Sequence, residues 1–221
     1  MRRRRRARLA AADLGRSRGG LTTKTHLSCV PQCLPLSLKI TAGQAGDSPQ
    51  FIPVLNRIRV PGPVGRPRTR PDAVAGDKAY SSRQNRSHLR KRGIKAVIPE
   101  KKDQAAHRKN RGSRGGRPVT WDKQLYKLRN SVERTINKIK DWRGLAVRYD
   151  KKPESYQAGL ELCAGLLWIR YLGSQLVLTH APRRSRIPAG WLGRQRPPLP
   201  RPVSRATPTT GRLTEIVWSW A

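Results

Sequence analysis

Hydrophobic and polar residues alternate with a period of two in the first part of the chain. Residues 34–41 (LPLSLKIT) show the alternation most clearly, and residues 22–29 show it in a more mixed form. Because side chains of a strand point to opposite faces in turn, this pattern is typical of β-structure. It predicts two paired strands that meet across a turn at residues 30–32 (VPQ).

A helical spacing of apolar residues follows. Five apolar side chains recur at intervals that place them on one helix face: Phe51, Ile52, Val54, Leu55 and Ile58. Ser48 precedes them, and its side chain is suited to accept a hydrogen bond from the first turn of a helix. The spacing predicts a short amphipathic helix that is capped by Ser48 and ends before Pro61.

The middle of the chain alternates strand and helix signals. Residues 73–77 (AVAGD) form a short apolar run that ends on a carboxylate, Asp77, and residues 96–99 (AVIP) form another. Between the two runs, Ser81 or Ser82 is placed to cap a basic helix. The alternation predicts an α/β domain in which both runs are buried strands.

The second half of the chain is predicted to be largely helical. Residues 100–118 are polar, basic and rich in glycine, which favours a mobile loop. Asp122 is placed to cap a long helix that reaches Trp142, and a further helix opens at Pro153. That last helix carries six apolar residues that we expect to be buried: Leu160, Leu162, Leu166, Leu167, Ile169 and Leu172. Residues 173–221 show no periodic element, and their Arg and Pro content favours disorder.

Charge decides the class of partner. The 221 residues include 48 Lys and Arg against 13 Asp and Glu, which gives a formal net charge of +35. A field of that sign concentrates polyanions, so nucleic acid is the expected partner. The three cysteines do not form a disulfide framework, and no apolar run reaches the roughly 18 residues that span a bilayer. These features predict a cytoplasmic, nucleoid-associated protein and exclude a transmembrane one.

Candidate chemistry lies in the long predicted helix. Tyr126, Arg129, Glu133 and Lys140 follow one another at spacings of three, four and seven residues, which places them on one stripe of the helix. Such a stripe is most often an exposed network of ion pairs. Asp77 changes this view, because two converging carboxylates repel each other unless a divalent cation such as Mg²⁺ bridges them. Together with a phosphate, the pair predicts metal-assisted phosphoryl chemistry.

The same residues resemble the signature of a known family. The pattern Tyr-x2-Arg-x3-Glu-x6-Lys at residues 126–140 is similar to the block around the last acid of the DDE transposases of insertion sequences. Residues 77–82 (DKAYSS) resemble the block around their second acid. Residues 15–27 (GRSRGGLTTKTHL) and 41–47 (TAGQAGD) look like two further blocks of the same family.

The resemblance implies a fold, an activity and a cofactor. The implied fold is a ribonuclease H-like mixed sheet flanked by helices, within a catalytic domain of residues 14–172. The implied activity is DNA cleavage and strand transfer at the element ends and the target DNA, with Mg²⁺ or Mn²⁺, and the intact family member could form a homo-oligomer. Asp77 and Glu133 are the implied catalytic metal ligands. Contacts to DNA or phosphate are implied for three residues: Tyr126, Arg129 and Lys140.

The chain also departs from the family. The family's first acid lies on a strand before the block at residues 15–20, where this chain has a basic leader (residues 1–13) whose sole acid, Asp13, lacks an apolar strand around it. We therefore expect the sheet to lack its first, central strand and the site to lack its first Asp. This predicts an inactive transposase fragment that binds DNA, with disordered basic tails at residues 1–13 and 173–221. Two alternatives stay open: a basic nucleic-acid-binding protein without chemistry, and a chain that does not fold stably.

Overall fold

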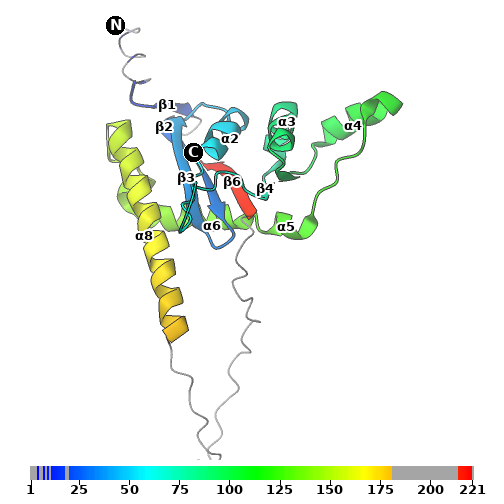
Figure 1. Ribbon diagram of the computed structural model, residues 1–221. Coiled ribbons are helices and arrows are strands. Elements are labelled where there is room, and N and C mark those ends of the chain that lie inside the picture. Colours follow the sequence, from blue (N-terminus) through cyan, green and yellow to red (C-terminus); the bar gives the residue numbers. More distant parts are fainter. Residues whose placement is uncertain are drawn as a thin grey trace, which may run out of the picture.

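One sheet lies between two layers of helices in the computed structural model, which describes residues 4, 7, 9, 11–17, 20–180 and 214–220 (Figure 1). The predicted mixed α/β class is confirmed. The sheet has six strands: β1 (Gly15–Ser17), β2 (Gly20–Val30), β3 (Leu34–Ala42), β4 (Ala73–Ala75), β5 (Lys95–Val97) and β6 (Thr214–Trp220).

The helices vary widely in length. Seven α-helices are described: α2 (Asp47–Asn56), α3 (Arg83–Lys91), α4 (Lys102–Asn110), α5 (Lys123–Lys127), α6 (Asn130–Lys140), α7 (Arg143–Ala146) and α8 (Pro153–His180). Two short 3₁₀ helices accompany them: η1 (Lys78–Tyr80) and η2 (Gly112–Gly115). Within the part of the chain that the structure describes, no helix has the length and apolar content needed to cross a membrane.

Strands β2 and β3 form an antiparallel hairpin, as the alternation of their residues predicts. The turn occupies residues 31–33, one position later than expected, and Cys33 completes it with a positive φ of 62°. The Cys33 amide donates to the carbonyl oxygen of Val30 at 3.0 Å. Inside the hairpin, the Ser28 and Ser37 hydroxyls lie 2.8 Å apart, and Ser37 also donates to the Val54 carbonyl of α2 at 2.9 Å. The hairpin is thereby tied to the first helix.

Strands β4 and β5 run parallel, with Val74 opposite Ala96. Helix α3 connects them, and Ser82 is its cap, because its hydroxyl accepts a hydrogen bond from the Asn85 amide at 3.1 Å. Gly93 follows the helix with a φ of +64°, a conformation that ends helices and suits glycine. Both predicted strands and the capped helix between them are confirmed.

The centre of the sheet corrects the sequence-based expectation. Strand β6 lies between β2 and β4, antiparallel to the first and parallel to the second (Figure 1). Ile216 pairs with Cys29 of β2 and with Ala75 of β4. The expectation that the sheet lacks a central strand is therefore wrong, and so is the expectation that no periodic element follows residue 172. That the family's own first strand is missing stays a prediction. The local signal is a short run rich in Ile, Val and Trp, which favour strands.

The helical layer around α8 also extends further than predicted. Helix α8 continues to His180, eight residues past the expected end of the domain. Residues 181–213 of the predicted tail and most of the predicted leader lie outside the described residues. The proposed domain boundaries therefore stay predictions.

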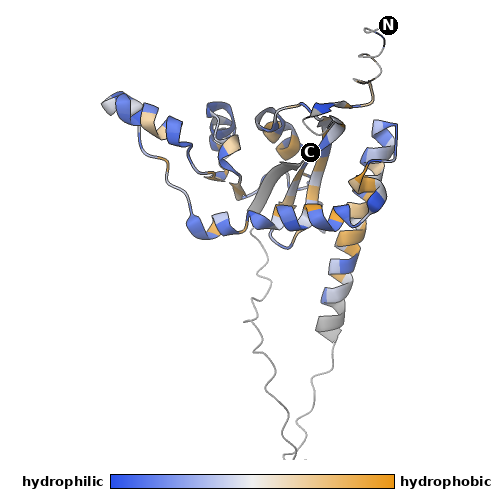
Figure 2. Cartoon of the chain, turned by 180° about the vertical axis from the view of Figure 1, so that it is seen from behind, coloured by the Kyte–Doolittle hydropathy of each residue, from blue (hydrophilic) through white to orange (hydrophobic). Residues whose placement is uncertain are grey.

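Two apolar clusters fill the space on either side of the sheet. Strand β4 contributes to both, since Val74 packs toward α2 and α3 whereas Ala73 and Ala75 pack toward α6. The cluster around α2 and α3 consists of Phe51, Val54, Leu55, Ile58, Val74, Tyr80, Leu89, Ile94 and Ile98. The cluster around α6 and α8 includes Leu27, Cys29, Leu38, Val132, Ile136, Ile139, Leu145, Tyr156 and Leu160. Figure 2 shows hydrophobic residues on the strands and on the helix faces turned toward them.

Helix α8 covers β3 with one face only. Its inner side buries Leu160, and Trp168 donates from Nε1 to the Pro35 carbonyl at 2.7 Å. Its outer side exposes three apolar residues, Leu162, Ile169 and Leu172, to 61%, 66% and 53%. The prediction that all six apolar residues of this helix are buried is wrong for these three, because the helix is apolar all round and the sheet meets one side of it.

Two local predictions need correction. Helix α2 begins directly after Gly46, so Ser48 is not its cap; the Ser48 hydroxyl accepts a hydrogen bond from the Asn85 side chain at 3.2 Å. Residues 100–118, predicted as a mobile loop, contain α4 and η2. Side-chain contacts with Ser81 and with Glu100 hold α4, and these contacts cannot be read from composition.

The central strand yields a first prediction. Ile216→Pro removes an amide donor from β6 at a position that pairs with Cys29 of β2 and with Ala75 of β4, and we expect the free energy of unfolding to fall by about 3 kcal/mol. Val64→Pro, the same change in a loop where the side chain is 91% exposed, is the matched control and should have little effect. Urea denaturation of both variants measures the difference. Equal stabilities would show that β6 is not part of the sheet.

A buried histidine yields a second prediction. His26 of β2 is 1% exposed, contacts the Thr41 hydroxyl at 2.8 Å, and has a pKa lowered to about 4 by burial. Since the unfolded chain binds a proton near pH 6.5 and the folded protein does not, stability should fall as pH drops through the window from 6.5 to 4. Between pH 7.5 and pH 5 the loss due to His26 is about 2 kcal/mol. In the His26→Gln variant, the free energy of unfolding measured with denaturant should therefore fall less between pH 7.5 and pH 5 than in the unmodified protein. An identical pH dependence in the two proteins would contradict the assignment.

Candidate active site

The end of β4 places Asp77. All three residues of the strand are buried, and the amide of Gly76 continues the pairing with β5 by donating to the Val97 carbonyl at 3.3 Å. Asp77 comes next and is half-buried, and its carbonyl accepts a hydrogen bond from the Tyr80 amide at 3.0 Å. The prediction of a buried strand that ends on this carboxylate is confirmed. The carboxyl ends of parallel strands are a common position for binding sites.

The predicted long helix is two helices. Asp122 caps the first of them, α5, as expected, with its carboxylate accepting from the Gln124 and Leu125 amides at 2.9 and 3.1 Å. Between α5 and α6, the amides of Leu128 and Arg129 bond to carbonyls three residues back, at 3.1 Å each. This tighter 3₁₀ turn rotates the chain by about 120° per residue where an α-helix rotates by 100°. The single stripe predicted for a continuous helix is therefore twisted at Arg129.

Three side chains form a cluster at the turn between α5 and α6. The Arg129 guanidinium lies 5.3 Å from the centre of the Tyr126 ring, which is a cation–π contact. The Trp121 ring meets the same tyrosine edge-on, with ring centres 4.8 Å apart. Trp121 is not part of the sequence motif, and its separation of five residues from Tyr126 does not identify it as a ring partner. The cluster holds the tyrosine from two sides.

Asp77 joins this cluster through Tyr126. Burial raises the pKa of Tyr126, Arg129 opposes the rise with its positive charge, and Asp77 adds to it through its negative charge and a hydrogen bond. These effects require the phenol and the carboxylate to be neighbours, with the hydroxyl as donor. The structure thus brings together three predicted site residues, Asp77, Tyr126 and Arg129.

The other two predicted residues lie further along α6. Glu133 is in the first turn, one helical turn beyond Arg129, and is exposed. A negative charge at the amino end of a helix interacts favourably with the helix dipole. Lys140 is in the last turn and is half-buried. The opposite side of α6 packs onto the sheet through Val132, Ile136 and Ile139.

The carboxylates suit a metal only in part. Among the described residues, no group of three or more His, Cys, Asp or Glu side chains is arranged to hold a metal ion. Mg²⁺, however, commonly uses one or two carboxylates and completes its shell with water and substrate phosphates. Asp77 and Glu133 are the right type of ligand for such a shared site, and Arg129 supplies positive charge for a phosphate.

Comparisons with known proteins agree with the motif. A family model described as "Transposase DDE domain" matches residues 5–167. The chain is 31% identical over 150 residues to a Brucella ovis protein assigned as the transposase for insertion sequence element IS6501, an alignment that covers 68% of this chain and 100% of that protein. It is 30% identical over 148 residues to a Burkholderia cepacia protein assigned as the transposase for insertion sequence element IS402, covering 66% of this chain and 63% of that protein. No solved structure matches the chain.

The contact between Asp77 and Tyr126 is directly testable. Asp77→Asn removes the negative charge beside the phenol, so the pKa of Tyr126 should fall and the phenolate should form at lower pH. NMR titration of protein with ¹³C-labelled tyrosine measures this. Tyr156 is the internal control, because burial raises its pKa at a site that involves Arg148 and not Asp77. If the titration of Tyr126 does not move relative to that of Tyr156, the two groups are not neighbours.

Proposed function

Because the chain belongs to the DDE-domain transposases of insertion sequences, we propose that it binds DNA and carries a site for Mg²⁺-dependent strand cleavage and transfer. The observation that carries the proposal is the contact of Asp77, at the end of β4, with the Tyr126–Arg129 pair at the start of α6. A strand end and a helix far apart in sequence thereby meet at the motif by which the family is recognised.

The sheet supports a ribonuclease H-like fold as part of this proposal. Strands β2 and β3 are antiparallel, and β4 and β5 are parallel. Strand β6, between β2 and β4, is antiparallel to β2 and parallel to β4. Helices cover both faces. In this arrangement the carboxyl end of β4 and the exposed side of α6 are the positions at which the two acids, Asp77 and Glu133, would act together.

Each residue of the motif has a role that follows from its chemistry. Bound Mg²⁺ would activate a water or a 3′-hydroxyl and stabilise the leaving oxygen of the phosphodiester. Asp77 and Glu133 would hold it, and Tyr126 would orient the Asp77 carboxylate by donating a hydrogen bond. Arg129 is positioned by its stacking on Tyr126 and presents a planar set of donors that suits a phosphate. Lys140 adds positive charge to the same helix.

The number of acids sets the expected activity. The central strand β6 lies beside β4, and its one acid, Glu215, pairs in register with Val74. Asp13 lies near the start of β2, where its carbonyl accepts from the Thr23 hydroxyl at 2.7 Å and from Arg148 at 3.3 Å. In the part of the chain that the structure describes, no third acid forms a metal-binding group with Asp77 and Glu133, so we propose that this chain alone does not cleave DNA efficiently.

A second candidate function follows from the same observation. The net charge of +35 suits the protein to bind nucleic acid without any chemistry, and in the described residues no third acid joins Asp77 and Glu133 in a metal-binding group. In that case Asp77 and Glu133 serve only to stabilise the turn between α5 and α6. Metal binding separates the two functions, because only the first needs it.

The test is Mn²⁺ binding in the presence of a duplex oligonucleotide of arbitrary sequence, followed by electron paramagnetic resonance. We expect Asp77→Asn and Glu133→Gln each to weaken Mn²⁺ binding by tenfold or more, since each removes a charged oxygen ligand; tenfold is about 1.4 kcal/mol. Asp150→Asn and Glu154→Gln, the same changes at exposed acids elsewhere, are the matched controls.

The outcomes divide as follows. Equal Mn²⁺ affinity in all four variants would overturn the metal site and leave nucleic-acid binding as the function. Cleavage of the duplex by the unmodified chain in Mg²⁺, lost in Asp77→Asn, would support the metal site and contradict the proposed inactivity.

A further inference from the structure

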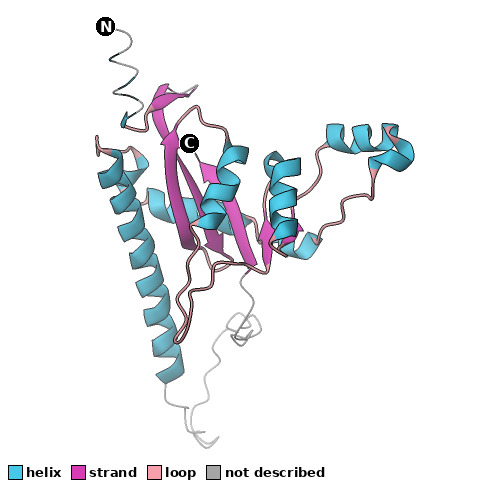
Figure 3. Ribbon diagram, turned by 45° about the horizontal axis from the view of Figure 1, so that its top comes forward, coloured by secondary structure: helices cyan, strands magenta, loops and turns pink. Residues whose placement is uncertain are grey.

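A basic arm extends from the sheet between β5 and α5. It comprises residues 100–118 and contains α4 and η2. No residue of α4 is buried, and Figures 1 and 3 show the helix projecting away from the rest of the protein. Figure 2 shows its surface as mainly hydrophilic. Burial of apolar side chains therefore does not account for the position of the arm.

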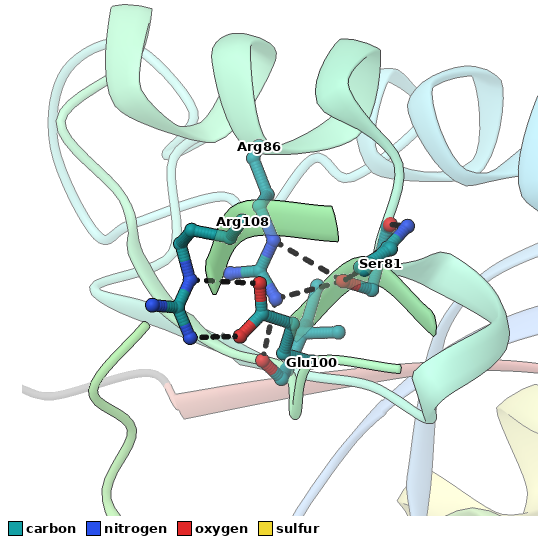
Figure 4. Close-up of polar contacts among 6 residues, drawn as sticks. Ser81, Arg86, Glu100 and Arg108 are labelled. Carbon is teal, nitrogen blue, oxygen red and sulfur yellow. Dashed lines mark hydrogen bonds and ion pairs between the residues drawn. The ribbon is translucent and has the colours of Figure 1, made fainter. Parts of the chain in front are cut away.

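Polar contacts fix the root of the arm (Figure 4). Arg108 of α4 donates to both oxygens of Glu100, at 3.3 and 3.0 Å, and the two side chains are only 20% and 16% exposed. Gln104 donates to the Ser81 carbonyl at 2.6 Å and accepts from the Ser81 hydroxyl at 2.9 Å. Arg86 of α3 donates to that hydroxyl as well, at 2.9 Å. Since Ser81 lies four residues after Asp77, the root is attached to the segment that bears the candidate site.

The tip of the arm is a formed turn. The backbone of Gly115 passes so close to the Arg108 carbonyl that a side chain there would collide with it. Gly116 then reverses the chain with a φ of +75°. The turn folds back on the end of α4, so the residues around it have fixed positions relative to the helix.

The charge of the arm is nearly all of one sign. Residues 100–118 include seven Lys and Arg against two acids, Asp103 and the Glu100 that is paired with Arg108. Three arginines at intervals of three surround the tip, all of them exposed: Arg111, Arg114 and Arg117. Residues three apart in a 3₁₀ turn lie on the same side, which applies to Arg111 and Arg114 at the two ends of η2. Among the ion pairs found in the described residues, none joins any of the three to a carboxylate.

We propose that the arm is a second DNA-binding surface, which holds the phosphate backbone of a duplex through Arg111, Arg114 and Arg117. Arginine suits this task because its planar donors bind phosphate oxygens in pairs. The proposal rests on the proposed function in taking DNA as the partner, but it does not use the carboxylates. Holding one duplex at the arm and at Asp77 needs a fixed distance between them, and the contacts of Ser81 and Gln104 provide it.

The test compares two triple variants of equal charge. One replaces the three tip arginines by Gln, and its control replaces three exposed bases of α3: Arg83→Gln, Arg90→Gln and Lys91→Gln. Affinity for a 30-bp duplex is measured by fluorescence anisotropy from 50 to 200 mM salt. Three lost phosphate contacts lower the salt slope by about 2.7, so the unmodified protein should lose about 40-fold more affinity over this range than the tip variant.

The outcomes are distinct from those of the metal test. A smaller slope in the tip variant alone supports the arm, whatever Mn²⁺ does at Asp77 and Glu133. Equal slopes in the two triple variants would overturn the proposal, because binding would then follow total charge. Tighter binding of single-stranded RNA or of a polyglutamate peptide than of the duplex, with the same loss in the tip variant, would overturn the choice of partner.

A single variant tests the root. Glu100→Gln removes a negative charge, so electrostatics alone would strengthen duplex binding. If the Glu100–Arg108 pair holds the arm in place, binding should weaken by several-fold, with the melting temperature recorded as a check on folding. An equal or higher affinity would show that the root does not position the arm.

Discussion

The two-sided pairing of β6 is the constraint on which the structure depends. Without it, the antiparallel hairpin and the parallel pair β4–β5 would each have an open edge of unpaired amides and carbonyls, and burying those groups unpaired is costly. The two apolar clusters pack against the two faces of the joined sheet, so neither cluster could form in full if the sheet were split into two parts. The candidate site inherits this dependence, because Asp77 follows β4 and α6 packs on β2 and β6.

The distribution of charge determines which ligands the candidate site on this sheet can attract. A chain of charge +35 attracts polyanions over much of its surface, which gives affinity for DNA without sequence preference. Carboxylates are scarce, and Asp77 and Arg129 share Tyr126 as a neighbour. The basic arm adds positive charge at its tip, where none of the ion pairs found in the described residues joins Arg111, Arg114 or Arg117 to an acid.

Much of this architecture could be predicted from local pattern, and the failures share a cause. The hairpin, the cap at Ser82 and the run that ends at Asp77 depend on neighbours in sequence, and the structure has all three. The role of β6 depends on pairing with Ala75, 141 residues away from its partner Ile216, which no local period encodes. The break before α6 is a 3₁₀ turn in place of an expected α-helical turn, and the backbone dihedral angles of the two differ too little for the sequence pattern to distinguish them. The motif Tyr-x2-Arg-x3-Glu-x6-Lys gave the site residues through resemblance, while their contacts came from the fold.

The order of strands in the sheet has a consequence for how the protein is made. The central strand is the last of the described elements to leave the ribosome, although its two neighbours, β2 and β4, emerge much earlier. Until β6 has been synthesised, the hairpin β2–β3 and the parallel pair β4–β5 therefore each have an unpaired strand edge. Pairing between residues so far apart in sequence also forms slowly. A nascent chain in this state offers two strand edges to any neighbour, including another copy of itself. Its yield in a cell would then depend on how well chaperones protect those edges until translation ends.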